Sequence, residues 1–176
     1  MVENFHECHD FVERLATPKA PYRFVDSGLP NVYLIGVRYW ICKECGKQRA
    51  EIPFLKDLMV KIARAVVRQE APLNHAEIRF LRKRLGKKSS EFAKIIGITP
   101  EHLSRLESGD TAYNTSKSAD RLIRVYYSLL SGDESLKDTM NKHIDAYMAS
   151  LHGEDQASNF RAALRDKEWE AEAVPA

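Results

Sequence analysis

The stretch of residues 77–109 constrains the fold of this chain more than any other. It reads EIRFLRKRLGKKSSEFAKIIGITPEHLSRLESG, in which apolar residues recur at helical spacing and Gly86 and Gly97 interrupt them. Thr99 and Pro100 are the residue types preferred at a helix N-cap and in its first turn. The stretch therefore predicts a helix that ends at Gly86, a short second helix that ends at Gly97, and a third helix that opens at Thr99.

Two sets of side chains are expected in these three helices. The inward set is apolar apart from one arginine: Ile78, Leu81, Arg82, Leu85, Phe92, Ala93, Ile96, Leu103 and Leu106. The outward set of the third helix is polar: Glu101, His102, Ser104, Arg105 and Ser108. Ser89 or Ser90 is predicted to cap the second helix, and Gly97 to supply the positive φ of the turn. This is the layout of a helix-turn-helix, whose last helix enters the DNA major groove.

Composition limits the class of protein. A chain of 176 residues can hold one ordinary domain or two small ones. Its 44% hydrophobic and 30% charged residues are typical of a soluble globular protein. No apolar run approaches the ~20 residues of a membrane span, and the N-terminal MVENFHECHD lacks the basic and apolar regions of a signal peptide. We therefore expect a cytoplasmic protein.

Charge is unevenly distributed although the net charge is only +2. Residues 71–132 carry 11 Lys and Arg against 6 Asp and Glu, whereas residues 133–176 carry 5 against 10. Six basic residues fall within ten positions of the middle region: Arg79, Arg82, Lys83, Arg84, Lys87 and Lys88. Such a cluster is either a surface that faces phosphates or a solvated helix face, and charge alone does not decide between them.

The N-terminal region reads differently from the middle. Residues 3–16 have apolar positions at helical spacing and predict a helix. Three β-like runs follow, separated by turn residues, and predict a small antiparallel sheet or hairpin. The runs span residues 22–25, 31–41 and 46–52. A second predicted helix begins at Pro53 and ends near Glu70.

Beyond the middle region, residues 134–151 and 156–171 each carry an amphipathic pattern that predicts a helix. The chain is therefore expected to be mainly α, with a small β-rich unit at its N-terminus that carries the C-x-x-C and looks like a zinc knuckle. The expected parts are a strand-rich unit, a connecting helix, a DNA-binding domain and an acidic helical tail. They span residues 1–52, 53–73, 74–132 and 133–176.

The cysteines suggest a metal site. Cys42 and Cys45 form a C-x-x-C followed by Gly46, as in a zinc knuckle, but a structural zinc needs four ligands and this motif supplies two. The candidate partners lie near the N-terminus: His6, Cys8 and His9. A turn without metal and a redox pair are the alternatives, and Cys8 also fits the apolar side of the helix predicted for residues 3–16. The residues leave zinc and these alternatives open.

Residues 75–131 resemble the Xre-type family, which has the fold of the lambdoid phage repressors. The resemblance is spread over the whole motif and includes Ala93 at a close helix approach and Gly97 in the turn. It implies that this part of the chain is a five-helix domain whose third helix reads DNA. Arg82 and Glu107 match a buried ion pair common in the family, which implies a structural role for both.

The resemblance also implies DNA contacts at matching positions. Arg105 would hold guanine O6 and N7, and Glu101 would accept from cytosine N4, with Pro100 and His102 flanking that footprint. Phosphate contacts are implied for Lys88, Ser89, Ser90, Thr99, Ser104, Asn114, Ser116 and Lys117. The plain alternative for Glu101 and Arg105, four positions apart, is a surface ion pair that contributes a few tenths of a kcal/mol.

Residues 22 to about 131 are also similar to the zinc-finger/helix-turn-helix proteins of the YgiT/MqsA type. The similarity rests on the order of parts: a strand-rich unit with C-x-x-C-G, a connecting helix, then EIRFLRKRLG and the Xre-type motif. It implies an N-terminal unit that binds metal through two C-x-x-C pairs and, in antitoxins, binds the toxin. The chain departs from this pattern because it lacks the first C-x-x-C and has a longer acidic tail.

Two functions follow from these observations. The first is a homodimeric transcriptional repressor that reads a palindromic operator, with the helix near residues 119–131 or the tail as the dimer contact. The second is the antitoxin of a type II toxin–antitoxin pair, which binds a toxin and represses its own operon. An enzyme is not expected, because no nucleophile, base and carboxylate are grouped. The histidines likewise form no ligand motif: His6, His9, His75, His102, His143 and His152.

Overall fold

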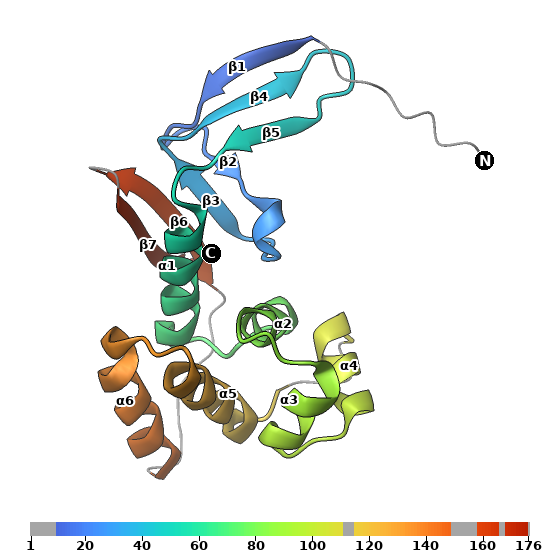
Figure 1. Cartoon of the computed structure of the whole chain (residues 1–176), viewed down its shortest axis with the longest axis vertical. Coiled ribbons are helices and arrows are strands. Elements are labelled where there is room, and N and C mark those ends of the chain that lie inside the picture. The colour runs from blue at the N-terminus through green and yellow to red at the C-terminus, as the bar shows by residue number, and fades with distance from the viewer. Residues whose placement is uncertain (1–9, 111–114, 149–157, 166–167, 176) are drawn as a thin grey trace, which may run out of the picture.

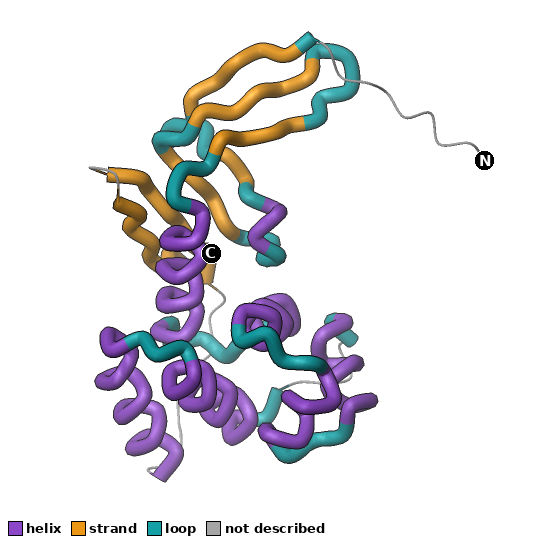
Figure 2. The backbone as a smooth tube through the Cα atoms, viewed as in Figure 1, coloured by secondary structure: helices purple, strands orange, loops and turns teal. Residues whose placement is uncertain are grey.

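The computed structural model describes residues 10–110, 115–148, 158–165 and 168–175, and its two halves differ in kind (Figure 1). Figure 2 shows the strands gathered in one half of the molecule and most of the helices in the other, with one long helix between them. We call these parts the β half and the helical half. Among the described residues, no helix is both long enough and apolar enough to cross a membrane.

The first sheet is antiparallel, with the order β1-β4-β5. Its strands are β1 (Phe11–Leu15), β4 (Arg38–Cys42) and β5 (Gln48–Glu51). The helix predicted for residues 3–16 is therefore wrong over β1, and residues 1–9 lie outside the described part. Successive side chains of β1 lie on opposite faces of the sheet. The backbone of β1 pairs with β4 from Phe11↔Cys42 to Leu15↔Arg38.

The second sheet joins the two ends of the chain, in the order β2-β3-β6-β7. Its strands are β2 (Tyr22–Arg23), β3 (Val32–Ile35), β6 (Ser158–Arg165) and β7 (Glu168–Pro175). The three predicted β-like runs all contain strands, but the strands divide between two sheets and do not form the one small antiparallel sheet or hairpin expected. A short 3₁₀ helix at Val25–Ser27 lies between β2 and β3. β6 lies parallel to β3, with Val32 opposite Phe160.

The helix predicted for residues 156–171 is wrong, because the described part of this segment is the β6–β7 hairpin. Trp169 of β7 is fully buried, and its indole N–H donates to the Pro53 carbonyl oxygen at 2.8 Å. The hairpin packs against the central helix, and Ala162 of β6 is buried in the core beside Val32 and Leu34. Pairing with β3 gives the backbone of β6 the hydrogen bonds that a helix would otherwise have supplied.

The central helix, α1 (Leu55–Arg68), begins two residues after the predicted start at Pro53. Its amphipathic pattern places one stripe in the core: Leu58, Ile62, Ala63, Ala65, Val66 and Val67. Phe54, which precedes α1, is the single described non-glycine residue with positive φ, at 51°, and its side chain is exposed. α1 therefore covers the second sheet with one end and reaches the helical half with the other (Figure 1).

The helical half contains α2 (His75–Arg84), α3 (Ser89–Ile96), α4 (Pro100–Ser108), α5 (Lys117–Leu130) and α6 (Lys137–Met148), with a 3₁₀ turn at Glu134–Leu136. Within the described part of residues 74–132 there are four helices, so the five-helix domain expected for that range is not reproduced. α6 confirms the first of the two predicted tail helices over its described residues.

Arginines attach α1 to the helical half. Arg124 of α5 is 1% exposed. Its guanidinium donates to backbone carbonyl oxygens at the end of α1 and just beyond it: those of Val66, Val67, Gln69 and Ala71. The last carbonyls of a helix have no intrahelical donors, so Arg124 satisfies groups that would otherwise be buried without partners. Asp120, one turn earlier, accepts from the same guanidinium and from the Leu73 N–H.

Two more arginines, both in α1, complete this connection. Arg64 donates through two nitrogens to the Asp133 carboxylate, and Arg68 donates to the Ser135 carbonyl oxygen at 2.7 Å. We call Arg64, Arg68 and Arg124 the arginine seam. Because these bonds cross from the central helix to α5 and the segment after it, the seam fixes how the β half is held against the helical half.

Candidate nucleic-acid interface

The turn between α3 and α4 has the geometry that the sequence predicts. Gly97 has φ 74°, a left-handed conformation that glycine adopts without steric cost. Thr99 is the N-cap of α4, and its hydroxyl oxygen accepts from the His102 backbone N–H at 3.2 Å. Pro100 occupies the first turn, where its missing N–H costs nothing. The start of α4 is therefore fixed by three local signals within four residues.

α4 is held from below by its apolar residues and by one ion pair. Leu103 and Leu106 are buried, as predicted. Arg82 of α2 makes two bonds of 2.6 Å to the two carboxylate oxygens of Glu107, which confirms the predicted pair. A further bond runs from Arg82 to the Lys87 carbonyl oxygen. The hydrogen bond to Glu107 raises the pKa of Arg82, so the pair stays charged and ties α2 to α4.

The opposite side of α4 faces outward. Glu101, Ser104, Arg105 and Ser108 are exposed, whereas His102 is half-buried. The pKa of Glu101 lies below its ordinary value because its own backbone N–H donates to the carboxylate, with the Thr99 hydroxyl and the charge of Arg105 adding to the effect. Glu101 is thus an ionised acceptor at neutral pH. The helix presents a polar, exposed surface on a rigid base.

The residues expected at phosphates lie at or near helix N-termini, with one correction. The N-cap of α3 is Lys88, without a side-chain cap bond, so Ser89 and Ser90 are first-turn residues and neither is the cap. Lys88 is exposed. The structure places Ser104 on the outer side of α4, and Thr99 at its cap. Helix N-termini carry partial positive charge and unpaired N–H groups, which favour bound phosphate.

The last set of residues expected to contact phosphate lies at the start of α5. Ser116 is its N-cap and accepts from the Ala119 N–H at 3.1 Å, and Lys117 is its first residue and exposed. Asn114, the remaining predicted contact, lies outside the described residues. The hydroxyl of Ser116 therefore already has a capping partner, while the ammonium of Lys117 is accessible from solvent.

The basic cluster of α2 and the following turn does not act as one surface. Arg82 bonds to Glu107, Lys87 pairs with Glu91, and Arg84 lies near the hydroxyl of Tyr127, whose pKa it lowers. Three members of the cluster have exposed side chains for which no such pairing is resolved: Arg79, Lys83 and Lys88. The sequence shows six charges within ten positions, but three of the six have structural partners within the helical half.

Cys42 and Cys45 lie on either side of the turn between β4 and β5, and the described residues do not complete a metal site there. Cys42 is buried at the end of β4, and Cys45 is exposed in the turn before β5. In the described part of the chain, no three His, Cys, Asp or Glu residues gather as metal ligands would. The candidate partners His6, Cys8 and His9 fall outside it.

Two buried charged residues of the helical half, Glu77 and Arg124, were not identified from the sequence. Glu77 is 1% exposed and accepts from the Gln69 side chain and the Asn74 backbone N–H. Burial raises its pKa to about 7, against the opposing effects of these hydrogen bonds and of Arg124. The Asn74–Glu77 capping box was readable from the S/T/N-x-x-E pattern, whereas nothing in the sequence marks Arg124 as buried.

Comparison with known families finds a match for the segment that contains this turn and α4. A family described as Helix-turn-helix has a model that matches residues 78–123, from the fourth residue of α2 to the middle of α5. The matched range includes the turn at Gly97, the whole of α4 and both members of the Arg82–Glu107 pair. No curated protein and no solved structure matches the chain.

Proposed function

We propose that this protein is a sequence-specific transcriptional repressor that binds operator DNA through α4. One observation carries the proposal: α4 exposes Glu101, Ser104 and Arg105 on a helix held by buried leucines and by the Arg82–Glu107 pair, inside the segment that matches the helix-turn-helix family. Preorganised side chains on a rigid element suit base readout, because little conformational freedom is lost on binding.

In this proposal the two ends of the outer face of α4 read different bases. Arg105 presents five N–H donors in a planar fork, which match guanine O6 and N7. Glu101, ionised at neutral pH, accepts from cytosine N4. Pro100 and His102 lie beside this footprint, and the His102 side chain is half-buried. Lys88 and Lys117 would then face phosphates on either side.

We also propose that the repressor acts as a homodimer on a palindromic operator, since recognition helices must lie ~34 Å apart to enter successive major grooves. Leu122 and Leu129 of α5 support a contact between copies. They are seven residues apart and so lie on one side of the helix, and Leu129 is 64% exposed. Leu129→Lys should convert the dimer to a monomer in sedimentation equilibrium.

DNA binding is tested by in vitro selection from a library of random duplexes. The proposal predicts enriched half-sites that repeat with two-fold symmetry, about one helical turn apart. Recovery of no preferred sequence would contradict it. The selected duplex is then the substrate for all variant measurements.

Lys88→Ala should weaken binding to all sequences alike. A lysine at a phosphate releases about one counterion, so the slope of log K against log salt should become shallower by about 0.9 per protomer. Lys94→Ala removes the same charge from the exposed side of the same helix, near its other end, and should leave the slope unchanged. Equal slopes for the two variants would show that Lys88 does not contact a phosphate.

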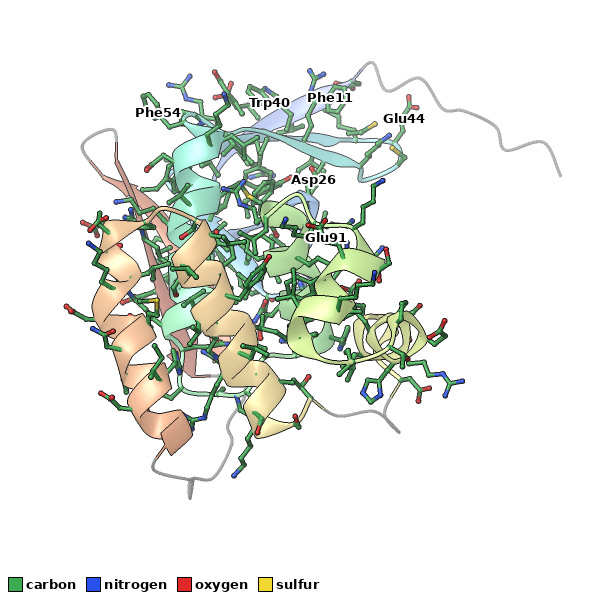
Figure 3. The ribbon with its side chains drawn as sticks, turned by 60° about the horizontal axis from the view of Figure 1, so that its bottom comes forward. Phe11, Asp26, Trp40, Glu44, Phe54 and Glu91 are labelled. Carbon is green, nitrogen blue, oxygen red and sulfur yellow. The ribbon has the colours of Figure 1, made fainter. Side chains whose placement is uncertain are left out.

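An antitoxin is the second candidate, and the outer face of the first sheet favours it. Residues opposite one another on paired strands share a face, so Phe11 and Glu13 lie on the same side as Trp40 and Arg49. The Arg49 guanidinium lies 4.4 Å from the Phe11 ring centroid and 5.9 Å from that of Trp40. Figure 3 shows Phe11, Trp40 and Phe54 along one border of the molecule.

Aromatic and arginine side chains that stay partly exposed are frequent anchors of protein–protein contacts, and the Phe11 and Trp40 rings are half-buried here. If this face holds a toxin, the product of the neighbouring gene should co-purify with the wild-type chain and be lost with Trp40→Ala, while DNA binding is kept. Zinc at Cys42 and Cys45 is a separate expectation, tested by metal analysis of the purified protein. Zinc in the wild type and none in Cys45→Ser would support it.

A further inference from the structure

A cavity of about 340 Å³ lies at the junction of α1, α2 and α5, on residues that the proposed DNA interface does not use. Its volume falls at the lower end of the range of small-molecule sites. Val60 from α1, Leu85 from the end of α2 and Leu130 from the end of α5 form an apolar wall. Arg84, Tyr127 and Asp133 form a polar wall. The lining therefore combines an apolar surface with a few converging polar groups.

The polar wall carries one positive charge and one negative charge, and the negative one is paired with Arg64. Tyr127 is 5% exposed, and the nearby charge of Arg84 lowers the pKa of its hydroxyl against the larger effect of burial. Burial raises the pKa of Tyr127, so the hydroxyl keeps its proton and can donate it to a ligand. The carboxylate of Asp133 is engaged by two nitrogens of Arg64, which offsets its charge. The guanidinium of Arg84 is left as the charge that a ligand would meet.

We propose that this cavity binds a small organic carboxylate. The carboxylate would accept from Arg84 and from the Tyr127 hydroxyl, and its apolar body would lie against Val60, Leu85 and Leu130. Arginine matches a carboxylate with two parallel hydrogen bonds, which gives the site both charge and orientation.

The position of the cavity gives such a ligand a route to the DNA interface. Leu85 directly precedes Gly86, where the chain turns toward α3, and Asp133 belongs to the arginine seam contact of Arg64. A ligand between α1, α2 and α5 therefore touches both the base of the helix-turn-helix and the connection to the β half. This consequence rests on the proposed function, whereas binding of the carboxylate does not.

Direct binding to the purified full chain tests the proposal. The probe is 2-naphthoate, and its uncharged twin is 2-naphthamide, both followed by isothermal titration calorimetry. The site predicts saturable 2-naphthoate binding with a Kd of about 1 mM or tighter. Loss of a charge-assisted hydrogen bond should make 2-naphthamide bind about tenfold or more weakly.

Two variants locate the site. Arg84→Gln should weaken 2-naphthoate about tenfold, whereas Lys83→Gln, which removes the neighbouring exposed charge on α2, should leave the Kd within about twofold. Tyr127→Phe keeps the ring and removes the hydroxyl, so it tests the same wall should Arg84→Gln unfold. No saturable binding to the wild type, equal affinity for both probes, or equal Kd values for the Arg84 and Lys83 variants would overturn the proposal.

A separate readout tests the coupling. In the wild type, saturating 2-naphthoate should change the affinity for the selected duplex at least about fivefold, in either direction. Unchanged DNA affinity with intact 2-naphthoate binding would reject the coupling and keep the site. Failure to bind any duplex, with 2-naphthoate still bound, would reject the proposed function and leave the cavity proposal intact.

Discussion

The helical half and the β half are stabilised by contacts of opposite range. In the helical half, Asn74, Thr99 and Ser116 each cap a helix through a backbone N–H two or three residues away. In the β half, Val32 of β3 lies opposite Phe160 of β6, so one sheet needs both ends of the chain. The helical half is thus specified by neighbours in sequence, and the β half by partners that only the folded chain brings together.

The arginine seam is where these two kinds of structure meet. Arg124 of α5 donates hydrogen bonds to carbonyl oxygens at the end of α1 that have no donor within that helix. Both tryptophans of the chain, Trp40 and Trp169, belong to the β half, so tryptophan fluorescence reports that half separately from the helical circular dichroism signal. The difference between the halves can therefore be measured directly.

Arg124→Ala should have the largest effect on the comparison. It leaves Asp120 and several buried carbonyls without their donor, and removing one partner of a buried pair costs about 3–5 kcal/mol of unfolding free energy. We expect the fluorescence and circular dichroism transitions in urea, coincident in the wild type, to separate in the variant. Arg121→Ala on the same helix is the control, with a change of about 0.5 kcal/mol or less. Coincident transitions in Arg124→Ala would show that the seam does not join the halves.

Glu77 should give a pH dependence of about 3 kcal/mol. Its pKa rises from 4.5 to about 7 on folding, so the native state binds its proton more tightly than the unfolded chain does. The stabilisation is fully present below pH 4.5 and is lost as pH rises through 7. Unfolding free energies of the wild type and Glu77→Gln, measured from pH 4.5 to 8, should therefore diverge with this sign.

Ser90→Ala on α3 serves as the control for Glu77, because it changes an exposed side chain and no titratable group. The difference between wild type and Ser90→Ala should stay flat over the same pH range. A difference between wild type and Glu77→Gln that is flat, or that grows in the opposite direction, would contradict the assignment of the raised pKa to Glu77.

Trp169→Phe should have the next largest effect and should confine it to the β half. The variant keeps most of the buried ring but removes the N–H that donates to the Pro53 carbonyl oxygen, which costs about 2 kcal/mol. Trp40→Phe changes a half-buried ring and is the matched control. Urea unfolding followed by the fluorescence of the tryptophan that each variant retains measures both. Equal loss in the two variants would mean that the C-terminal hairpin adds little to the second sheet.

The same contrast explains how much the sequence could predict. Gly97, Thr99 and Pro100 act locally, so the turn, the start of α4 and its outward face could be placed before the structure was known. The Arg82–Glu107 pair was also predictable, but only through a resemblance, because its members belong to different helices.

The failures lie where distant partners override local pattern. Residues 11–15 and 158–165 have helical spacing, yet each segment pairs with a strand far away in sequence. The burial of Arg124 and the position of Arg84 in the cavity wall both depend on how α1 packs. No local sequence pattern encodes that packing. Ser89 was predicted as a cap because serine prefers that position, but α3 starts one residue earlier, after Lys88.

The central claim is that the exposed face of α4 reads bases. It is tested most directly by the binding free energy of the selected duplex and of each single base-pair change, for the wild type, Arg105→Ala and Ser108→Ala. We expect Arg105→Ala to lose about 1–3 kcal/mol of discrimination at one base pair of each half-site and to keep discrimination at the others. Ser108→Ala should retain the wild-type profile. A uniform loss at every position in Arg105→Ala, or a profile identical to the wild type, would contradict the claim.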